Sequence, residues 1–172
     1  MIKIFLDKIY IKLLNGETYN NFLRKSGVII GNNCEIYKNV DFGSEPYLIK
    51  MGNHVRITNG VRFITHDGGV WVFRENLHKN IDVFGPIIIG NNVHIGMNSI
   101  IMPGVKIGNN CVIGAGAIVT KNIPDDSIAA GVPAKVIKSL AEYEKSSLLK
   151  SDDTKSLNNI DKKSYLLKKF FG

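Results

Sequence analysis

From residue 89 to residue 124 the chain reads IGNNVH, IGMNSI, IMPGVK, IGNNCV, IGAGAI and VTKNIP. The first residue of every hexad is Ile or Val, and the fifth is small or medium-sized and mostly apolar. An amphipathic helix, with its period of 3.6, cannot produce a sustained period of six. Short strands joined at three corners per turn do produce it, with one coil for every eighteen residues or so, and we therefore expect an all-β solenoid of triangular section.

The hexads also appear upstream. Their first positions are Ile30, Ile36, Met51, Ile57 and Phe63. The frame breaks over 42–50, where we expect a bulge or loop, and over 68–86, which we expect to be a long excursion. Gly at the second position is expected to permit a tight corner, and Asn at the third and fourth to suit a left-handed backbone there. These residues are Gly31, Gly52, Gly90, Gly96, Gly108 and Gly114, with Asn32, Asn53, Asn91 and Asn109.

Length and composition narrow the class of protein. A chain of 172 residues suits one globular domain, and its 37 Ile and Val residues favour strands. A charged share of 22% argues against a disordered tail or a coiled coil. No window approaches the roughly 18 apolar residues of a membrane-spanning helix. The N-terminal stretch lacks a small-residue cleavage site, so we expect no secretory signal and a cytoplasmic protein.

The flanks divide the chain into three expected parts. Residues 1–27 form a helical segment, with a packing helix over 2–14 and a second helix over 17–25. Residues 28–133 form the coils. Residues 134–172 form a C-terminal helix, beginning with AKVIKSLAEYEKSSLLK, and a basic tail. The tail ends in the amphipathic stretch DKKSYLLKKFFG, which could touch an anionic membrane surface, pack on its own oligomer or fray.

The hexads, followed by VTKNIP at 119–124 and AGVPAKVI at 130–137, resemble the left-handed β-helix acyltransferases. The nearest branch contains the galactoside, maltose, xenobiotic and cell-surface polysaccharide O-acetyltransferases. The resemblance implies a left-handed parallel β-helix, with short N-terminal helices and a C-terminal helix. It also implies acetyl-CoA as the acetyl donor and a homotrimer with active sites at subunit interfaces.

Four histidines are candidates for the chemistry: His54, His66, His78 and His94. Acetyl transfer to a sugar hydroxyl needs a base, and His matches that task. In the family a histidine at the end of a coil, just before an extended loop, is the general base, and FITHDGG at 63–69 places that role on His66. The alternative for His66 is a solvent-facing residue on a corner. Either Asp67 or a backbone carbonyl could orient it.

The other histidines have weaker assignments. His94 stands where many relatives carry Trp, and it could be a second base, a hydrogen-bond donor to the acceptor or a surface residue. His78 could line a neighbour's pocket or lie in a solvated loop, and His54 is expected on a flat outer face. The γ-class carbonic anhydrases share the hexads but have two closely spaced metal-binding histidines, which this chain lacks, so we expect no metal. Cys34 and Cys111 are expected as inward core residues.

The resemblance also assigns two binding regions. The expected coenzyme-binding residues are Met97, Gly114, Ala115, Thr120, Lys121, Gly131, Pro133, Lys135 and Lys138. The lysines would meet the coenzyme phosphates, although several relatives carry Arg at the last two lysine positions. The expected acceptor-binding residues are Asn39, Asp41, Glu45, Trp71 and His94. No side chain in the coenzyme set is an evident nucleophile, so we expect direct attack of the acceptor on the thioester.

Three functions remain open on this basis. The leading hypothesis is an acetyl-CoA-dependent O-acetyltransferase that acts on a sugar hydroxyl of a surface-polysaccharide building block, such as capsule or lipopolysaccharide. A xenobiotic acetyltransferase acting on chloramphenicol or streptogramins would have the same fold and base. A non-catalytic hexapeptide scaffold would trimerise without binding acetyl-CoA. Nucleic-acid binding is disfavoured, because a net charge of +7 comes without an aromatic-basic repeat. Membrane contact would be at most peripheral, at the inner face.

Overall fold

The structure is a computed structural model, and it describes residues 14–75 and 79–172. The helix expected over 2–14 and His78 therefore lie outside the described residues. Contacts within the chain divide it into two compact units, Met1–Ala141 and Glu142–Gly172. The first unit contains the coils, and the second contains most of the helix over 140–148 and all of the helix over 159–171.

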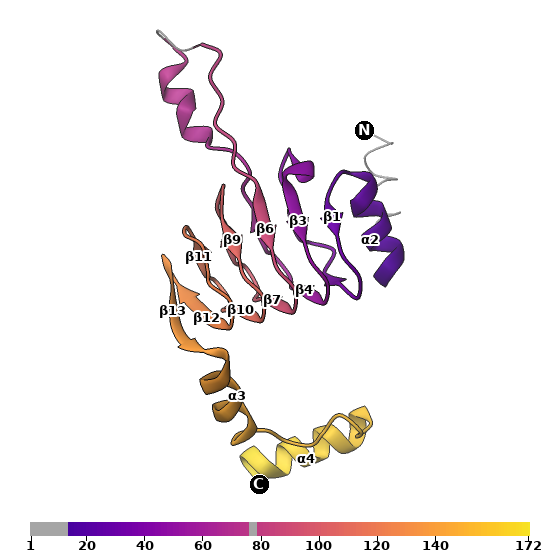
Figure 1. The fold of residues 1–172 in the computed structure, drawn as a ribbon. Coiled ribbons are helices and arrows are strands. Elements are labelled where there is room, and N and C mark those ends of the chain that lie inside the picture. The colour runs from indigo at the N-terminus through magenta and orange to yellow at the C-terminus, as the bar shows by residue number, and fades with distance from the viewer. Residues whose placement is uncertain (1–13, 76–78) are drawn as a thin grey trace. The chain divides into compact units, whose positions relative to one another are not determined.

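The coils of the first unit form three sheets (Figure 1). Sheet A contains β1 (Ile29–Ile30), β3 (Ile49–Met51), β6 (Ile87–Ile89) and β9 (Lys106–Ile107). Sheet B contains β2 (Glu35–Ile36), β4 (Val55–Ile57), β7 (Val93–Ile95), β10 (Cys111–Ile113), β12 (Ser127–Gly131) and β13 (Ala134–Ser139). Sheet C contains β5 (Arg62–Phe63), β8 (Ile100–Ile101) and β11 (Ile118–Val119). The chain visits the sheets in turn, and every pair except β12 with β13 is parallel.

The hexad register predicted from the sequence is the register of the strands as far as β11. After β11, Ile123, a fifth position of the predicted frame, bridges to Ile107, a first position, so the last coil is two residues shorter than predicted. Ile95 pairs with Ile113, and Ile101 pairs with Val119, so equivalent positions of successive coils lie side by side. First and fifth positions point inward, as predicted, and both cysteines are buried among them. The fully buried set includes Ile57, Phe63, Ile87, Ile95, Ile101, Ile113, Ala117 and Val119. The core is therefore a column of branched aliphatic side chains enclosed by the three sheets.

The corner between sheets A and B corrects the expectation for glycine and asparagine. The second-position glycines have no left-handed φ; instead, a Cβ on Gly90 would lie 2.7 Å from the backbone carbon of Gly108 in the next coil. Stacking distance between coils, and not backbone conformation, therefore requires glycine there. The left-handed residues occupy the fourth position and not the third. They are Asn33, His54, Asn92, Asn110 and Asp126, and His54 thus lies on a corner, where a flat face was predicted.

Two ladders of side chains hold this corner together. In the first ladder each third-position side chain accepts a hydrogen bond from the backbone N–H of the preceding coil. Asn53, Asn91, Asn109 and Asp125 are the acceptors, at 2.8–2.9 Å. In the second ladder Asn110 donates to Asp126, Asn92 donates to Asn110, and Asn92 accepts from His54. The polar side chains of the corner thus pair with one another from coil to coil.

The flanking segments close the first unit. The helix α2 (Gly16–Lys25) matches the prediction, and it packs Tyr19 and Leu23 against the first coil. The expected C-terminal helix begins later than predicted, because 134–139 forms β13, antiparallel to β12. The β-branched Val136 and Ile137 suit that strand. Helix α3 (Leu140–Leu148) follows it, and the polar stretch 151–158 precedes α4 (Asn159–Phe171). Among the described residues, no helix has the length and apolarity needed to cross a membrane.

Candidate acyl-transfer site

His66 lies where the chain leaves the coils. It follows β5 at the corner between sheets C and A, and the excursion returns beside it, with an antiparallel bridge between His66 and Phe84. Backbone bonds from Asp67 N–H to Val83 O and from Gly85 N–H to Thr65 O, both 2.9 Å, fix the base of the excursion. The helix η2 (Gly68–Phe73), at the start of the excursion, extends away from the stacked coils (Figure 1). His66 is thus anchored by paired backbone, while its side chain stays 42% exposed.

The group that orients His66 is Glu45, which was predicted to bind the acceptor. His66 Nδ1 lies 2.9 Å from Glu45 Oε2. The buried Thr65 hydroxyl donates to the same oxygen at 2.6 Å. These hydrogen bonds, with that of Thr65 the larger cause, lower the pKa of Glu45, so its carboxylate is charged near neutral pH. A carboxylate can only accept, and so Nδ1 carries a proton and Nε2 of the neutral ring is the basic nitrogen.

Neither orienting group considered for His66 from the sequence is the one found. Asp67 instead caps the short helix η2 (Gly68–Phe73), accepting from Gly69 N–H at 2.8 Å. Glu45 is brought to His66 by η1 (Pro46–Leu48), which forms where the hexad frame breaks in the first coil. Both interruptions of the repeat therefore meet at this one corner.

The remaining predicted acceptor residues are spread over the first unit. Asn39 is exposed in the turn after β2, and Asp41 bridges to Arg62 in sheet C while its carboxylate accepts from Gly43 N–H at 2.9 Å. Trp71 lies on η2 with 72% of its surface exposed. His94 lies on the outer face of sheet B. Within one chain, Glu45 alone among the five predicted residues hydrogen-bonds to His66 in the described structure.

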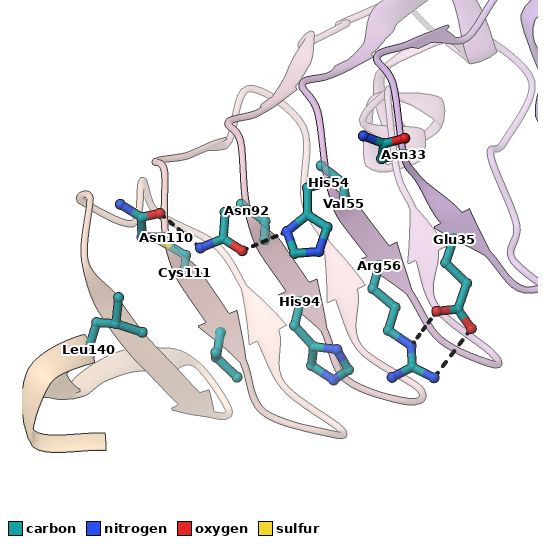
Figure 2. A pocket seen from close by; sticks show the side chains of 12 residues that line it. Asn33, Glu35, His54, Val55, Arg56, Asn92, His94, Asn110, Cys111 and Leu140 are labelled. Carbon is teal, nitrogen blue, oxygen red and sulfur yellow. Dashed lines mark hydrogen bonds and ion pairs between the residues drawn. The ribbon is translucent and has the colours of Figure 1, made fainter. Parts of the chain in front are cut away.

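The outer face of sheet B carries an open groove of about 510 Å³. Figure 2 shows His54, Arg56 and His94 along it, with Arg56 paired to Glu35 at 3.0 Å. Burial, followed by the positive charge of Arg56, lowers the pKa of His94. The groove therefore presents a neutral imidazole beside a guanidinium that already has a carboxylate partner.

The predicted coenzyme residues lie along two corners of the coils and on the β12–β13 hairpin. Met97, Gly114 and Ala115 lie at the corner between sheets B and C, where Gly116 N–H donates to Met97 O at 2.7 Å. Thr120 and Lys121 lie at the next corner, between sheets C and A, about 15 Å away along a strand of sheet C. Gly131 ends β12 and Pro133 lies in the turn of the hairpin, whose second strand carries Lys135 and Lys138.

Within residues 14–75 and 79–172, no group of three or more His, Cys, Asp or Glu side chains could hold a metal ion.

Comparisons with known proteins identify the family. Residues 86–121 match the family model described as bacterial transferase hexapeptide (six repeats). The chain is 55% identical to "Protein CapG" of Staphylococcus aureus over 168 residues, which cover 96% of each protein. The chain belongs to the hexapeptide-repeat transferase family.

Solved structures of the family share this fold. A maltose O-acetyltransferase from Clostridium difficile 630 superposes with a TM-score of 0.60 and 28% identity, over 77% of this chain and 81% of that one. A galactoside acetyltransferase in complex with coenzyme A superposes with a TM-score of 0.53 and 32% identity, over 75% and 73% of the two chains.

One feature of this hexapeptide-repeat transferase escaped prediction. Glu45 and His66 are 21 residues apart, and Glu45 lies within the break over 42–50, where no hexad register places it beside a residue of the next coil. The sequence feature that could have indicated this contact is the presence of two interruptions, over 42–50 and 68–86, in an otherwise continuous repeat. Interruptions on neighbouring coils project from the same corner when the coils stack in register.

Proposed function

We propose that the chain is an acetyl-CoA-dependent O-acetyltransferase that transfers an acetyl group to a sugar hydroxyl, with His66 as the general base. The observation that carries the proposal is the contact of His66 Nδ1 with the Glu45 carboxylate, on the corner from which the excursion departs. The maltose and galactoside enzymes with similar structures support a carbohydrate acceptor and a left-handed parallel β-helix. We propose a building block of a surface polysaccharide as the acceptor.

In the proposed reaction, the Glu45–His66 pair carries out the proton transfer. His66 Nε2 takes the proton of the acceptor hydroxyl, and the Glu45 carboxylate stabilises the positive charge that then develops on the ring. The same imidazolium can later return the proton to the departing thiolate. The lowered pKa of Glu45 serves this role, because its carboxylate remains available to pair with the charged ring.

Direct transfer, without an acyl-enzyme, is supported by the state of two thiols and one hydroxyl in the coils. Cys34 and Cys111 are buried, and burial raises the pKa of both thiols. Ser99 is buried and donates to the backbone oxygens of Gly96 and Gly114. None of these three side chains is placed to attack a thioester.

The residues proposed for coenzyme A fit a long, anionic ligand. Bound acetyl-CoA would supply the acetyl group as an activated thioester. Met97 and Ala115 are exposed on successive coils, and Lys121 and Lys135 are exposed cations for phosphate. Because Met97 and Ala115 lie at one edge of sheet C and Lys121 lies at the other, we propose that two copies complete each site, as in a homotrimer.

The test is a thiol-release assay with acetyl-CoA against neutral sugars, nucleotide-activated sugars, glycan fragments and antibiotics. We expect release above background hydrolysis with at least one carbohydrate and none with chloramphenicol or a streptogramin. Release with the antibiotics alone would replace the proposal by a xenobiotic acetyltransferase. Failure to bind acetyl-CoA in calorimetry would replace it by a non-catalytic scaffold.

A further inference from the structure

The C-terminal helix α4 carries an apolar stripe that the second unit does not cover. Asn158 caps the helix, and its side chain accepts from the backbone N–H groups of Ile160 and Asp161 at 2.9 and 3.0 Å. At 100° per residue, the apolar side chains gather within an arc of roughly 140°. The stripe consists of Ile160, Leu166, Leu167, Phe170 and Phe171. Exposed fractions of 80% for Ile160, 62% for Phe170 and 86% for Phe171 show that it faces solvent.

Lysines accompany the stripe along the whole helix. Lys162 and Lys163 line the same shallow apolar depression as Leu166 and Phe170, while Asp161 is the only acidic residue of α4. At the other end of the helix, Lys169 is held by Asp152 at 2.5 Å, and Tyr165 donates to the same carboxylate at 2.6 Å. The helix therefore presents a wide apolar face that is bordered, and at Lys163 interrupted, by positive charge.

The position of Lys163 decides between possible partners. If a second copy of α4 packed on the stripe, the ammonium of Lys163 would face the lysines of an equally basic helix, in a contact that removes water from all of them. At a lipid surface the aliphatic stem of lysine lies along apolar groups while its ammonium reaches the lipid phosphates. With 13 residues, α4 is about 20 Å long, too short to cross a hydrocarbon layer of about 30 Å.

We infer that α4 is an interfacial anchor that lies flat on an anionic lipid surface, with its apolar stripe inserted among the lipid chains and its lysines on the phosphates. This inference rests on the second unit alone and does not depend on the proposed enzymatic function. It assigns a role to the part of the chain that lies outside the hexads.

The test is sedimentation of the full chain with vesicles of phosphatidylcholine, with and without phosphatidylglycerol. We expect binding to the mixed vesicles and at least about tenfold weaker binding to phosphatidylcholine alone, since several lysines contribute. Leu167→Glu should weaken binding to the mixed vesicles at least about tenfold, because it places a carboxylate in the stripe. Lys163→Gln should weaken it by about fivefold.

The matched control is Leu149→Glu, the same chemical change at a side chain that is 82% exposed outside α4. We expect it to bind like the unaltered chain. Equal losses for the two glutamate variants would mean that net charge alone drives binding, and they would overturn the inference. So would an absence of binding, or a smaller oligomer for Leu167→Glu in light scattering, which would assign the stripe to a second copy. Circular dichroism checks that each variant keeps its helix.

Discussion

Two corners of the same three-sided coil differ in what their side chains do. At the corner between sheets A and B, every coil turns in the same way, and each of these polar side chains accepts a hydrogen bond from the backbone N–H of the equivalent residue in the preceding coil. At the corner between sheets C and A, the repeat is interrupted twice, at η1 and at the excursion that begins with η2. There His66 bonds to Glu45, a side chain of a different kind.

The comparison is clearest for the two histidines. His54 Nδ1 donates to Asn92 in a chain of amides that ends on the Asp126 carboxylate, so its hydrogen bond continues a structural ladder. His66 Nδ1 donates directly to a carboxylate, which can stabilise a charged ring. In the regular repeat the polar side chains form hydrogen bonds between equivalent positions of stacked coils. At the interruptions an imidazole lies against a carboxylate, an arrangement that can support acid–base chemistry.

Replacing the two histidines tests this contrast with the largest expected effect. His66→Ala should lower the rate of acetyl transfer by about 10²–10⁴, the usual contribution of a general base. Acetyl-CoA binding and the oligomeric state should not change. His54→Asn, which restores the ladder residue found at the equivalent positions of later coils, is the matched control and should keep nearly full activity. Thiol release would measure both, and equal losses would remove the functional difference between the corners.

Glu45→Gln tests the role proposed for Glu45 at the corner between sheets C and A. The amide can still accept from Nδ1 but cannot balance a charged ring, so we expect a loss of roughly tenfold to a hundredfold in kcat. The KM for acetyl-CoA should stay constant. Glu35→Gln removes a carboxylate of sheet B that pairs with Arg56, and it should leave kcat unchanged. A pH–rate profile of Glu45→Gln identical to that of the unaltered chain would assign Glu45 a structural role only.

A pair of glycines compares the stacked coils with the excursion. Gly90→Ala would place its Cβ 2.7 Å from a backbone carbon of the next coil, so we expect a loss of about 1–3 kcal/mol in the free energy of unfolding. The same change at Gly68, in the excursion, meets no atom within 4 Å and should be nearly neutral. Urea unfolding monitored by circular dichroism would measure the difference. Equal midpoints would show that the coils can separate to admit the methyl group.

The smallest expected effect concerns His94, on the outer face of sheet B. Because burial lowers the pKa of His94, the folded chain binds fewer protons there than the unfolded chain does. Its contribution to stability is therefore complete above the ordinary histidine pKa of about 6.5 and declines as the pH falls below it. His94→Asn should lose less stability than the unaltered chain between pH 7.5 and pH 5.5. Parallel urea midpoints for the two proteins over that range would contradict this expectation.

Much of the fold could be predicted from the sequence, and particular residues show where the prediction failed. The inward positions, the two interruptions and the amphipathic character of the tail were all predicted, because each follows from a spacing along the chain. The reason predicted for the second-position glycines was wrong, because what requires glycine there is the short distance between stacked coils. The helix predicted to begin at Ala134 begins at Leu140, because β12 offers an edge with which 134–139 pairs as a strand.

The sequence by itself determined the repeat, and the repeat determined the sheets, because a period of six places the same side chain inward on every coil. Only the tertiary structure decided that Glu45 is the partner of His66. That contact joins the break over 42–50 to the end of the hexad that begins at Phe63, and the conformation of the break depends on the coils from which it departs. Periodicity describes what recurs, whereas this site is built where the chain stops repeating.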